Sequence, residues 1–189
     1  MKPAQPYRPS KLSWVLRGAG LVGIILFTIA VATHRDRLQE FSTLGYAGAF
    51  LAMLVSNATL VLPAPGLIIV FVLGSTLNPV LVGTAAALGA ALGEMTGYFT
   101  GYTGLALVEE SAVALRIRGW MDRNGLLTIF ALSAVPNPFF DLAGLMAGAG
   151  RMPVWQFLSM AFLGKTIQAT SIAFAGALSL EWVEQLLQH

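Results

Sequence analysis

Cysteine is absent from this chain, and histidine and charged residues are scarce. Without cysteine, disulfide bonds, thiol catalysis and cysteine-ligated metals are excluded. The two histidines, His34 and His189, lie too far apart in the sequence to suggest a metal cluster. We find no nucleophile–base arrangement, phosphate-binding loop or metal-ligand spacing, and we therefore predict neither an enzyme nor a cofactor.

The shortage of charge indicates a membrane environment. Charged residues make up 11% of the chain, compared with about 25% in a typical soluble domain. None occurs between Phe41 and Gly93, and the mean hydropathy of the chain is +0.73. So small a soluble protein could not bury this stretch, whereas a bilayer can surround it. We predict an all-α integral membrane protein.

The basic residues are interpreted as topology signals, because they form no long patch that would bind nucleic acid. Residues 1–17 are basic without any acid, and we assign them to a cytoplasmic N-terminus. The apolar run 18–33 is either a secretory signal, with a cleavage-like Ala30-Val31-Ala32, or part of a transmembrane helix over 12–33. We favour the helix, since the rest of the chain is also membrane-embedded.

Two apolar segments are interrupted by prolines. Residues 44–77 contain Pro63-Ala64-Pro65-Gly66, and residues 125–150 contain Pro136-Asn137-Pro138. Proline breaks a continuous helix, and irregular backbone at membrane depth is tolerated only where protein or a cavity shields it. We predict a re-entrant helical hairpin for each segment.

Helix length supports the second hairpin more strongly than the first. Gly125–Pro136 and Pro138–Gly150 would form about 18 Å and about 20 Å of helix, and neither crosses a hydrocarbon core of about 30 Å. Leu44–Leu62, in contrast, is long enough to span by itself. For the first segment a full span therefore stays open as an alternative.

The two halves of the chain match in outline. Each predicted hairpin is followed by a segment long enough to span, over 80–104 and 154–180. Within these spans, Gly93-Glu94 corresponds to Gly164-Lys165. Between the halves, residues 105–124 are amphipathic and are predicted to lie at the membrane interface.

Charge distribution predicts that the repeats are inverted. Suppose that the N-terminus is cytoplasmic and that each hairpin returns to the side from which it enters. The only basic residues on the opposite side are then Arg35 and Arg37. The cytoplasmic segments then hold Lys2, Arg8, Lys11, Arg17, Arg116, Arg118, Arg123 and Arg151. This obeys the positive-inside rule, and inverted repeats with broken helices place a site near the midplane in many transporters.

Glu94 and Lys165 lie near the centres of their predicted spans. A charge at such a depth costs roughly 2.5–3.5 kcal/mol, so each residue needs a partner or a wet cavity. Three interpretations stay open: a polar transport site between the repeats, with or without proton coupling, a structural ion pair, or a glutamate that is neutral at pH 7.

Three further polar residues join the candidate path. Asn137-Pro138 has the pattern of a helix N-cap followed by a first-turn proline. Asp141 either complements the dipole of that helix or acts as a functional carboxylate deep in the membrane. Gln168 shares one side of the last span with Lys165. The predicted polar path comprises Glu94, Asn137, Asp141, Lys165 and Gln168.

Glycines recur every four residues in the first long span, at Gly89, Gly93, Gly97 and Gly101. A stripe of small residues lets another helix approach closely, so we interpret it as a packing face. Glu94 lies beside this face, and a helix that packs there would come close to the carboxylate.

Three blocks of sequence resemble one known family. They are Leu62-Pro63-Ala64-Pro65-Gly66, the glycine-rich stretch from Gly89 to Gly104, and the run from Pro136 to Gly144 followed by Gly164-Lys165. This pattern resembles the DedA family, also called the VTT or SNARE-associated membrane protein domain, over about residues 40–178. It is most similar to the subset that contains the eukaryotic vacuole-membrane autophagy scramblases.

The resemblance implies inverted repeats with two re-entrant hairpins, and lipid transport. Eukaryotic members scramble phospholipids, and some bacterial members recycle polyprenyl phosphate carriers with a dependence on proton motive force. Bacterial members commonly place acids and arginines beside the prolines, where this chain has Asn57, Leu67, Ser133 and Phe139. These departures favour passive scrambling, which needs fewer charges.

We therefore predict a membrane lipid transporter, a phospholipid scramblase or polyprenyl-phosphate flippase-like protein. Headgroups would move along the polar path between the hairpins. The expected partners are membrane lipids, and a homo-oligomer is compatible with the sequence. A proton-coupled small-ion or solute transporter and a membrane scaffold are the rival predictions. The expected location is the cell membrane of a prokaryote.

Overall fold

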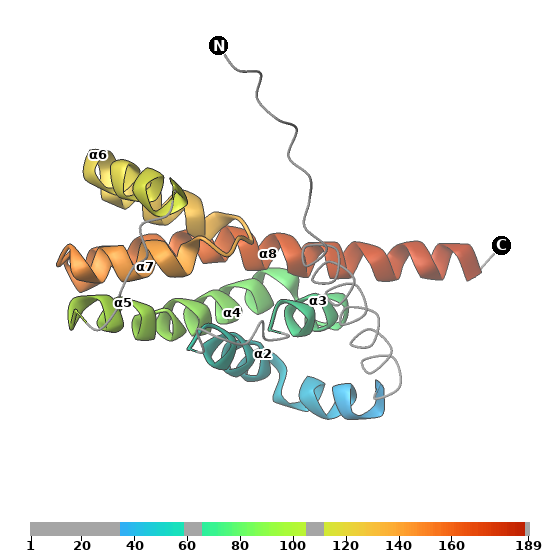
Figure 1. Ribbon diagram of the computed structural model, residues 1–189. Helices are drawn as coiled ribbons and strands as arrows, with labels where there is room; N and C mark the ends of the chain where they lie inside the picture. Colours follow the sequence, from blue (N-terminus) through green and yellow to red (C-terminus); the bar gives the residue numbers. More distant parts are fainter. Residues whose placement is uncertain (1–34, 59–65, 105–111, 188–189) are drawn as a thin grey trace, which may run out of the picture. The chain divides into compact units, whose positions relative to one another are not determined.

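The computed structural model describes residues 35–58, 66–104 and 112–187 (Figure 1). All regular secondary structure in these ranges is α-helical, which confirms the predicted all-α fold class for this part of the chain. The predicted N-terminal segments, 1–17 and 12–33, lie outside the described residues, as do Pro63 and Pro65 of the first break.

Internal contacts divide the chain into two units, Met1–Thr43 and Leu44–His189. Helix α2 (Arg35–Ala58) runs across this boundary and is interrupted at Gly45, where φ is 50° and ψ is −127°. Glycine adopts a positive φ without a steric penalty, so the chain can bend at this residue. Everything that follows concerns the second unit.

After α2, the described part of the second unit consists of α3 (Gly66–Thr76), α4 (Pro79–Gly93), α5 (Met95–Tyr102), α6 (Ala112–Ala134), α7 (Phe140–Ala149) and α8 (Val154–Leu187). The long helix α8 packs against α3, α4 and α6, and α7 packs against α5 and α6 (Figure 1). Elements from both halves of the sequence therefore meet along α8 and along the α4–α5 pair.

The helix predicted over 80–104 is divided at Glu94. Asn78 caps α4, with its side-chain oxygen 3.0 Å from the backbone nitrogen of Val80, and Pro79 begins the helix. At the division, the Glu94 backbone N–H still donates to Ala90 (3.0 Å), and its carbonyl accepts from Tyr98 (3.1 Å). The hydrogen-bond ladder thus continues through a local distortion, and α4 and α5 run in line.

Within the described residues, one stretch is long and apolar enough to cross a membrane, Pro79–Tyr102. Leu44–Ala58, Gly66–Thr76 and Phe140–Ala149 are apolar but shorter. The span predicted over 154–180 lies within α8, which is long enough but does not reach this apolarity.

The outer faces of the long helices carry large apolar side chains. On α4, Leu88 and Leu92 are 46% and 47% exposed, and on α8, Leu163 and Ile167 are 47% and 49% exposed. In both helices the two residues are four positions apart, so they lie on one face. Contiguous exposed apolar surface of this kind is typical of a membrane or protein contact, and it suits a lipid environment.

The second proline break separates helices α6 and α7. Helix α6 is bent at Asn124, the predicted end of the amphipathic segment, and ends at Ala134. Pro136-Asn137-Pro138 lies outside any helix, and α7 begins at Phe140.

The expected N-cap at Asn137 is wrong. The N-cap position of α7 falls on Phe139, which makes no side-chain cap. Asn137 instead stabilises the turn before it. Its side-chain oxygen accepts from the Phe139 backbone, and its amide nitrogen donates to the carbonyls of Leu132 and Val135, both at 2.7 Å. The asparagine side chain therefore satisfies backbone groups that the break leaves without helical partners.

At the first break, α2 ends at Ala58 and α3 begins at the buried Gly66. A Cβ atom at Gly66 would lie 2.4 Å from the Ser56 hydroxyl oxygen and 2.8 Å from the Met53 sulfur. The start of α3 therefore returns against the last turns of α2, and a larger residue there would require the side chains of Ser56 and Met53 to shift.

Glycines also set the closest approaches between helices, which agrees with the interpretation of the stripe as a packing face. A Cβ at Gly89 would lie 2.0 Å from the Phe50 carbonyl oxygen of α2. One at Gly101 would lie 1.9 Å from the Leu145 carbonyl oxygen of α7. Gly97, between them, is buried. The first half of the glycine stripe thus packs against α2, and the second half packs against α7.

Candidate functional site

The charged centre of the second unit is an ion pair between its two long helical elements. The Lys165 ammonium nitrogen of α8 lies 2.9 Å from a carboxylate oxygen of Glu94, at the α4–α5 junction. The two side chains are 8% and 5% exposed. Pairing offsets much of the cost of burying each charge, while removal of one partner would leave the other uncompensated.

A third helix contributes a polar group to this pair. Lys165 donates a second hydrogen bond, 3.0 Å long, to the side-chain oxygen of Asn57, and the Asn57 amide nitrogen donates to the Met53 carbonyl at 2.8 Å. Sequence reasoning did not assign Asn57 to the site. The available signal was a polar side chain near the end of an apolar helix, within the charge-free stretch between Phe41 and Gly93.

Aromatic rings cover another side of the ammonium group. Lys165 Nζ lies 4.7 Å from the centroid of the Phe140 ring, a geometry that favours a cation–π interaction. Phe140 stacks on Phe157 at 6.3 Å, and Phe157 stacks on Tyr98 at 5.1 Å. The Tyr98 hydroxyl donates to the Met152 carbonyl. The cation is thus held by a carboxylate, an amide oxygen and a ring that belongs to a packed aromatic row.

The last described residues before each chain break lie beside the ion pair. A Cβ at Gly93 would lie 2.6 Å from the Leu54 carbonyl oxygen and 2.9 Å from the Ala58 nitrogen, so the end of α2 rests beside Glu94. The Thr96 hydroxyl also donates to the Ala58 carbonyl, at 3.1 Å. Ala58, the last described residue before the first break, therefore lies close to the carboxylate.

The helix before the second break likewise ends beside Lys165. A Cβ at Gly164 would lie 2.6 Å from the Phe130 carbonyl oxygen and 2.9 Å from the Ala134 nitrogen. Helix α6 ends at Ala134, and Phe140 at the start of α7 supplies the ring beside Lys165. Described residues beside both breaks and the two predicted buried charges thus lie close together.

The structure does not gather all of the predicted path. Asp141 is exposed and makes no ion pair with another described residue, although its carboxylate interacts electrostatically with both Lys165 and Glu94. Asn137 is occupied by the turn. Gln168 is 6% exposed, and no hydrogen bond of its side chain occurs among the described residues. No group of three metal-ligating side chains is found in that part of the chain either.

Comparison with known proteins gives the same family as the sequence pattern. The family model for the VTT domain matches residues 64–178. Vacuole membrane protein KMS2 of Arabidopsis thaliana is 35% identical over 82 residues, which cover 38% of this chain and 20% of that protein. Vacuole membrane protein KMS1 of the same plant is 38% identical over 61 residues, covering 30% of this chain and 15% of that protein.

Human vacuole membrane protein 1 is 35% identical over 57 residues, covering 30% of this chain and 14% of that protein. The matches therefore cover a fifth or less of the length of these relatives. No solved structure matches this chain.

Proposed function

This chain belongs to the VTT-domain family and is an integral membrane protein; from that premise we propose that it lets phospholipids pass between the two leaflets of its membrane. The observation that carries the proposal is the buried Glu94–Lys165 pair flanked by the ends of α2 and α6. Helices that stop next to a charged centre leave polar backbone and side chains at a depth where a continuous helix would expose only hydrocarbon.

We place this centre near the middle of the bilayer. From the start of α8 at Val154 to Lys165 the helix rises about 16 Å, roughly half of a hydrocarbon core of about 30 Å. In this proposal α2–α3 and α6–α7 are the two re-entrant hairpins, and each packs on one side against the long helices.

Matching contacts support an inverted repeat. Gly93 meets residues 54 and 58 of the helix before the first break, and Gly164 meets residues 130 and 134 of the helix before the second. In both cases the contacting atoms are a carbonyl oxygen and a nitrogen four residues later. The same glycine therefore precedes the buried charge and receives the same part of a broken helix in each half.

A lipid path fits the second break because that break faces outward. Val135 and Phe139 are 59% and 45% exposed, and Asp141 is exposed one residue after the ring that covers Lys165. A headgroup moving along this surface would meet polar groups, while its acyl chains stayed among the apolar outer faces of the helices. Bacterial members of the family commonly place arginines beside the second proline, where this chain has Ser133 and Phe139. Without a guanidinium to bind a phosphate at these positions, scrambling of phospholipids is favoured over binding of a polyprenyl phosphate.

The orientation in this proposal follows the positive-inside rule, with the N-terminus in the cytoplasm of a prokaryotic cell. Arg116, Arg118, Arg123 and Arg151 then lie on the cytoplasmic side.

The test is reconstitution into vesicles that carry a phospholipid with a fluorescent headgroup. A reductant added outside bleaches only the outer leaflet of protein-free vesicles, so about half of the label survives. We expect the wild-type protein to make nearly all of the label bleachable, without any ion gradient. Glu94→Gln and Lys165→Met should slow this exchange in protein that still inserts into the vesicles.

Vesicles that retain as much label as the protein-free control would contradict lipid scrambling. If such vesicles took up a solute when a pH gradient was imposed, the function would instead be proton-coupled solute transport. Wild-type bleaching rates in both variants would remove the ion pair from the mechanism.

A further inference from the structure

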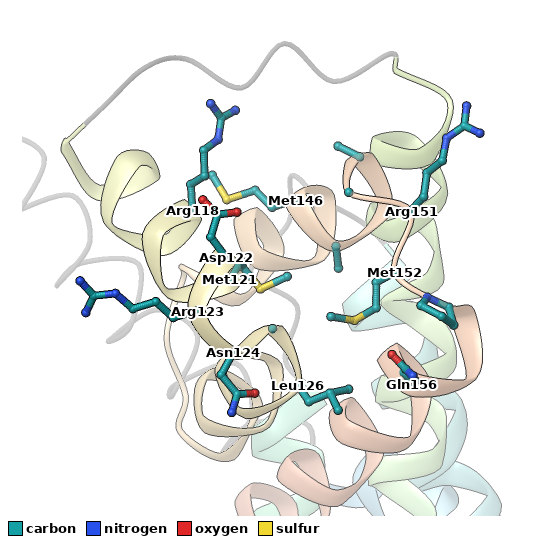
Figure 2. A pocket seen from close by; sticks show the side chains of 15 residues that line it. Arg118, Met121, Asp122, Arg123, Asn124, Leu126, Met146, Arg151, Met152 and Gln156 are labelled. Carbon is teal, nitrogen blue, oxygen red and sulfur yellow. The ribbon is translucent and has the colours of Figure 1, made fainter.

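A cavity of about 750 Å³ lies between α6, the end of α7 and the start of α8 (Figure 2). Neither Glu94 nor Lys165 lines it. Its lining is amphiphilic: three methionines contribute apolar surface, and arginine and amide side chains contribute the polar groups. These residues include Met121, Met146, Met152, Arg118, Arg151 and Gln156.

The cationic groups of this cavity lack acidic partners within the described chain. Arg118 and Arg151 stand on either side of Met146 and Met152 (Figure 2). Neither they nor the nearby Arg123 forms an ion pair with a described residue. Asp122 is the one acid of the lining, so the three arginines leave the cavity with an excess of positive charge. An anion would therefore be attracted to it, most strongly where water is partly excluded.

Arg151 occupies a backbone position that usually belongs to glycine. Its φ is 51°, in the left-handed region, directly after the end of α7, and its backbone N–H donates to the Gly148 carbonyl at 2.9 Å. Glycine ends a helix in this way without strain. The guanidinium lies 5.6 Å from the centroid of the Tyr102 ring, which holds it at the edge of the cavity. A residue that strains its backbone while its side chain is so positioned suggests a role for that side chain.

With the buried pair placed near the middle of the bilayer, as proposed above, the cavity falls at the depth of lipid headgroups. It adjoins the start of α8, about 16 Å along the helix from Lys165 and therefore about half a bilayer from the buried pair. Trp155 on α8 is 67% exposed, and Trp120 on α6 is 45% exposed. Tryptophan gathers at membrane interfaces, where its ring contacts lipid and its N–H contacts water.

We propose that this cavity binds the headgroup of an anionic phospholipid from the adjacent leaflet. Arg118 and Arg151 hold the phosphate, and the methionine surface contacts the glycerol and the first carbons of the acyl chains. A cavity of this size exceeds what a lone phosphate would fill, and its apolar lining suits an amphiphile. The site depends on the chain lying in a membrane but not on lipid transport.

The experiment is native mass spectrometry of the full chain in detergent, titrated with phosphatidylglycerol or with phosphatidylcholine of the same acyl chains. We expect one phosphatidylglycerol to be retained in preference to phosphatidylcholine. The double variant R118Q/R151Q should bind phosphatidylglycerol at least tenfold more weakly. Arg116→Gln is the matched control, because it removes the same charge from α6 but Arg116 faces a different hollow. It should bind as the wild type does.

A second variant separates binding from folding. Arg151→Gly relieves the left-handed backbone and should fold at least as stably as the wild type, yet lose several-fold in affinity for phosphatidylglycerol. Equal affinity in the wild type and R118Q/R151Q, or an equal loss in R116Q, would overturn the proposal. Displacement of the lipid by millimolar inorganic phosphate would also overturn it and indicate a free-phosphate site. A protein that binds lipid here but fails to scramble it would refute the proposed function alone.

Discussion

The cations of this protein are held in two contrasting ways. Lys165 is buried and receives a carboxylate, an amide oxygen and an aromatic ring from its own chain. Arg118 and Arg151 are exposed beside a cavity and receive no carboxylate from the described residues. A charged side chain buried at low dielectric needs a partner of opposite charge from the fold, whereas one at the membrane interface can be solvated by water or paired with a lipid headgroup. Lys165 therefore contributes largely to the stability of the fold, whereas Arg118 and Arg151 are available to bind a ligand.

The largest difference between the two kinds of cation is expected when the buried one is removed. Lys165→Met should lower the free energy of unfolding by about 3–5 kcal/mol, because Glu94 stays buried without its partner. Arg118→Met, at the cavity, should change it by no more than about 0.5 kcal/mol. Unfolding in detergent, followed by circular dichroism, measures both.

The exchanged pair, Glu94→Lys with Lys165→Glu, should recover a large part of that loss. Failure of the exchange to recover any stability would show that the surroundings, Asn57 and Phe140 included, fix which residue must be the cation. Equal losses in Lys165→Met and Arg118→Met would remove the contrast altogether.

The next prediction concerns Asn57, whose side-chain oxygen accepts a hydrogen bond from Lys165. Asn57→Leu should cost about 1.5–3 kcal/mol, the range for a hydrogen bond to a charged group. Gln168→Leu is the matched control, because Gln168 is buried one turn from Lys165 but makes no side-chain hydrogen bond among the described residues. Its replacement should be nearly neutral. A larger loss for Gln168→Leu than for Asn57→Leu in the same unfolding assay would assign the lysine a different partner.

Helix packing around the centre can be tested at one glycine. Gly101→Ala should cost about 1–3 kcal/mol, because the new Cβ would lie 1.9 Å from the Leu145 carbonyl oxygen and force α5 and α7 apart. Gly119→Ala, in α6, meets nothing within 4 Å and should stabilise the protein slightly, as alanine is the better helix former. Melting temperatures should move in opposite directions, and a shared direction would contradict the close approach.

The smallest expected effect lies at the cavity. Arg151→Gly should raise the free energy of unfolding by up to about 1 kcal/mol through relief of the left-handed backbone. Arg118→Gly, inside α6, should lower it by about 1 kcal/mol, since glycine is a poor helix former. The two arginines that would share one phosphate thus have opposite effects on stability. A destabilised Arg151→Gly protein would show that the guanidinium contributes more to the fold than its backbone costs.

Much of the architecture could be predicted because it depends on local chemistry. Proline cannot continue a helix, so the break at Pro136–Pro138 was visible in the sequence, and the bend at Asn124 fell at a predicted boundary. The scarcity of charge likewise predicted that Glu94 and Lys165 would need partners. Their pairing in space is one of the interpretations that the sequence left open.

What the sequence could not reveal depends on contacts between distant residues. The role of Asn57 requires the end of α2 to reach α8, and nothing near residue 57 indicates that approach. The division at Glu94 lies far along the helix from Pro79, so no proline marked it. Asp141 was grouped with the pair by its charge, but it lies on the exposed side of α7.

Depth in the bilayer is the most direct test, because the account requires the second proline break to lie near the midplane. The absence of cysteine allows single nitroxide labels at Phe139→Cys, beside the break, and at Trp155→Cys, at the predicted interface. Power-saturation electron paramagnetic resonance in vesicles compares their exposure to oxygen and to a water-soluble nickel chelate. We expect the label at position 139 to be the deeper one, by about half of the hydrocarbon thickness. Equal depth for both labels, at the headgroups, would contradict a re-entrant hairpin and the lipid path built on it.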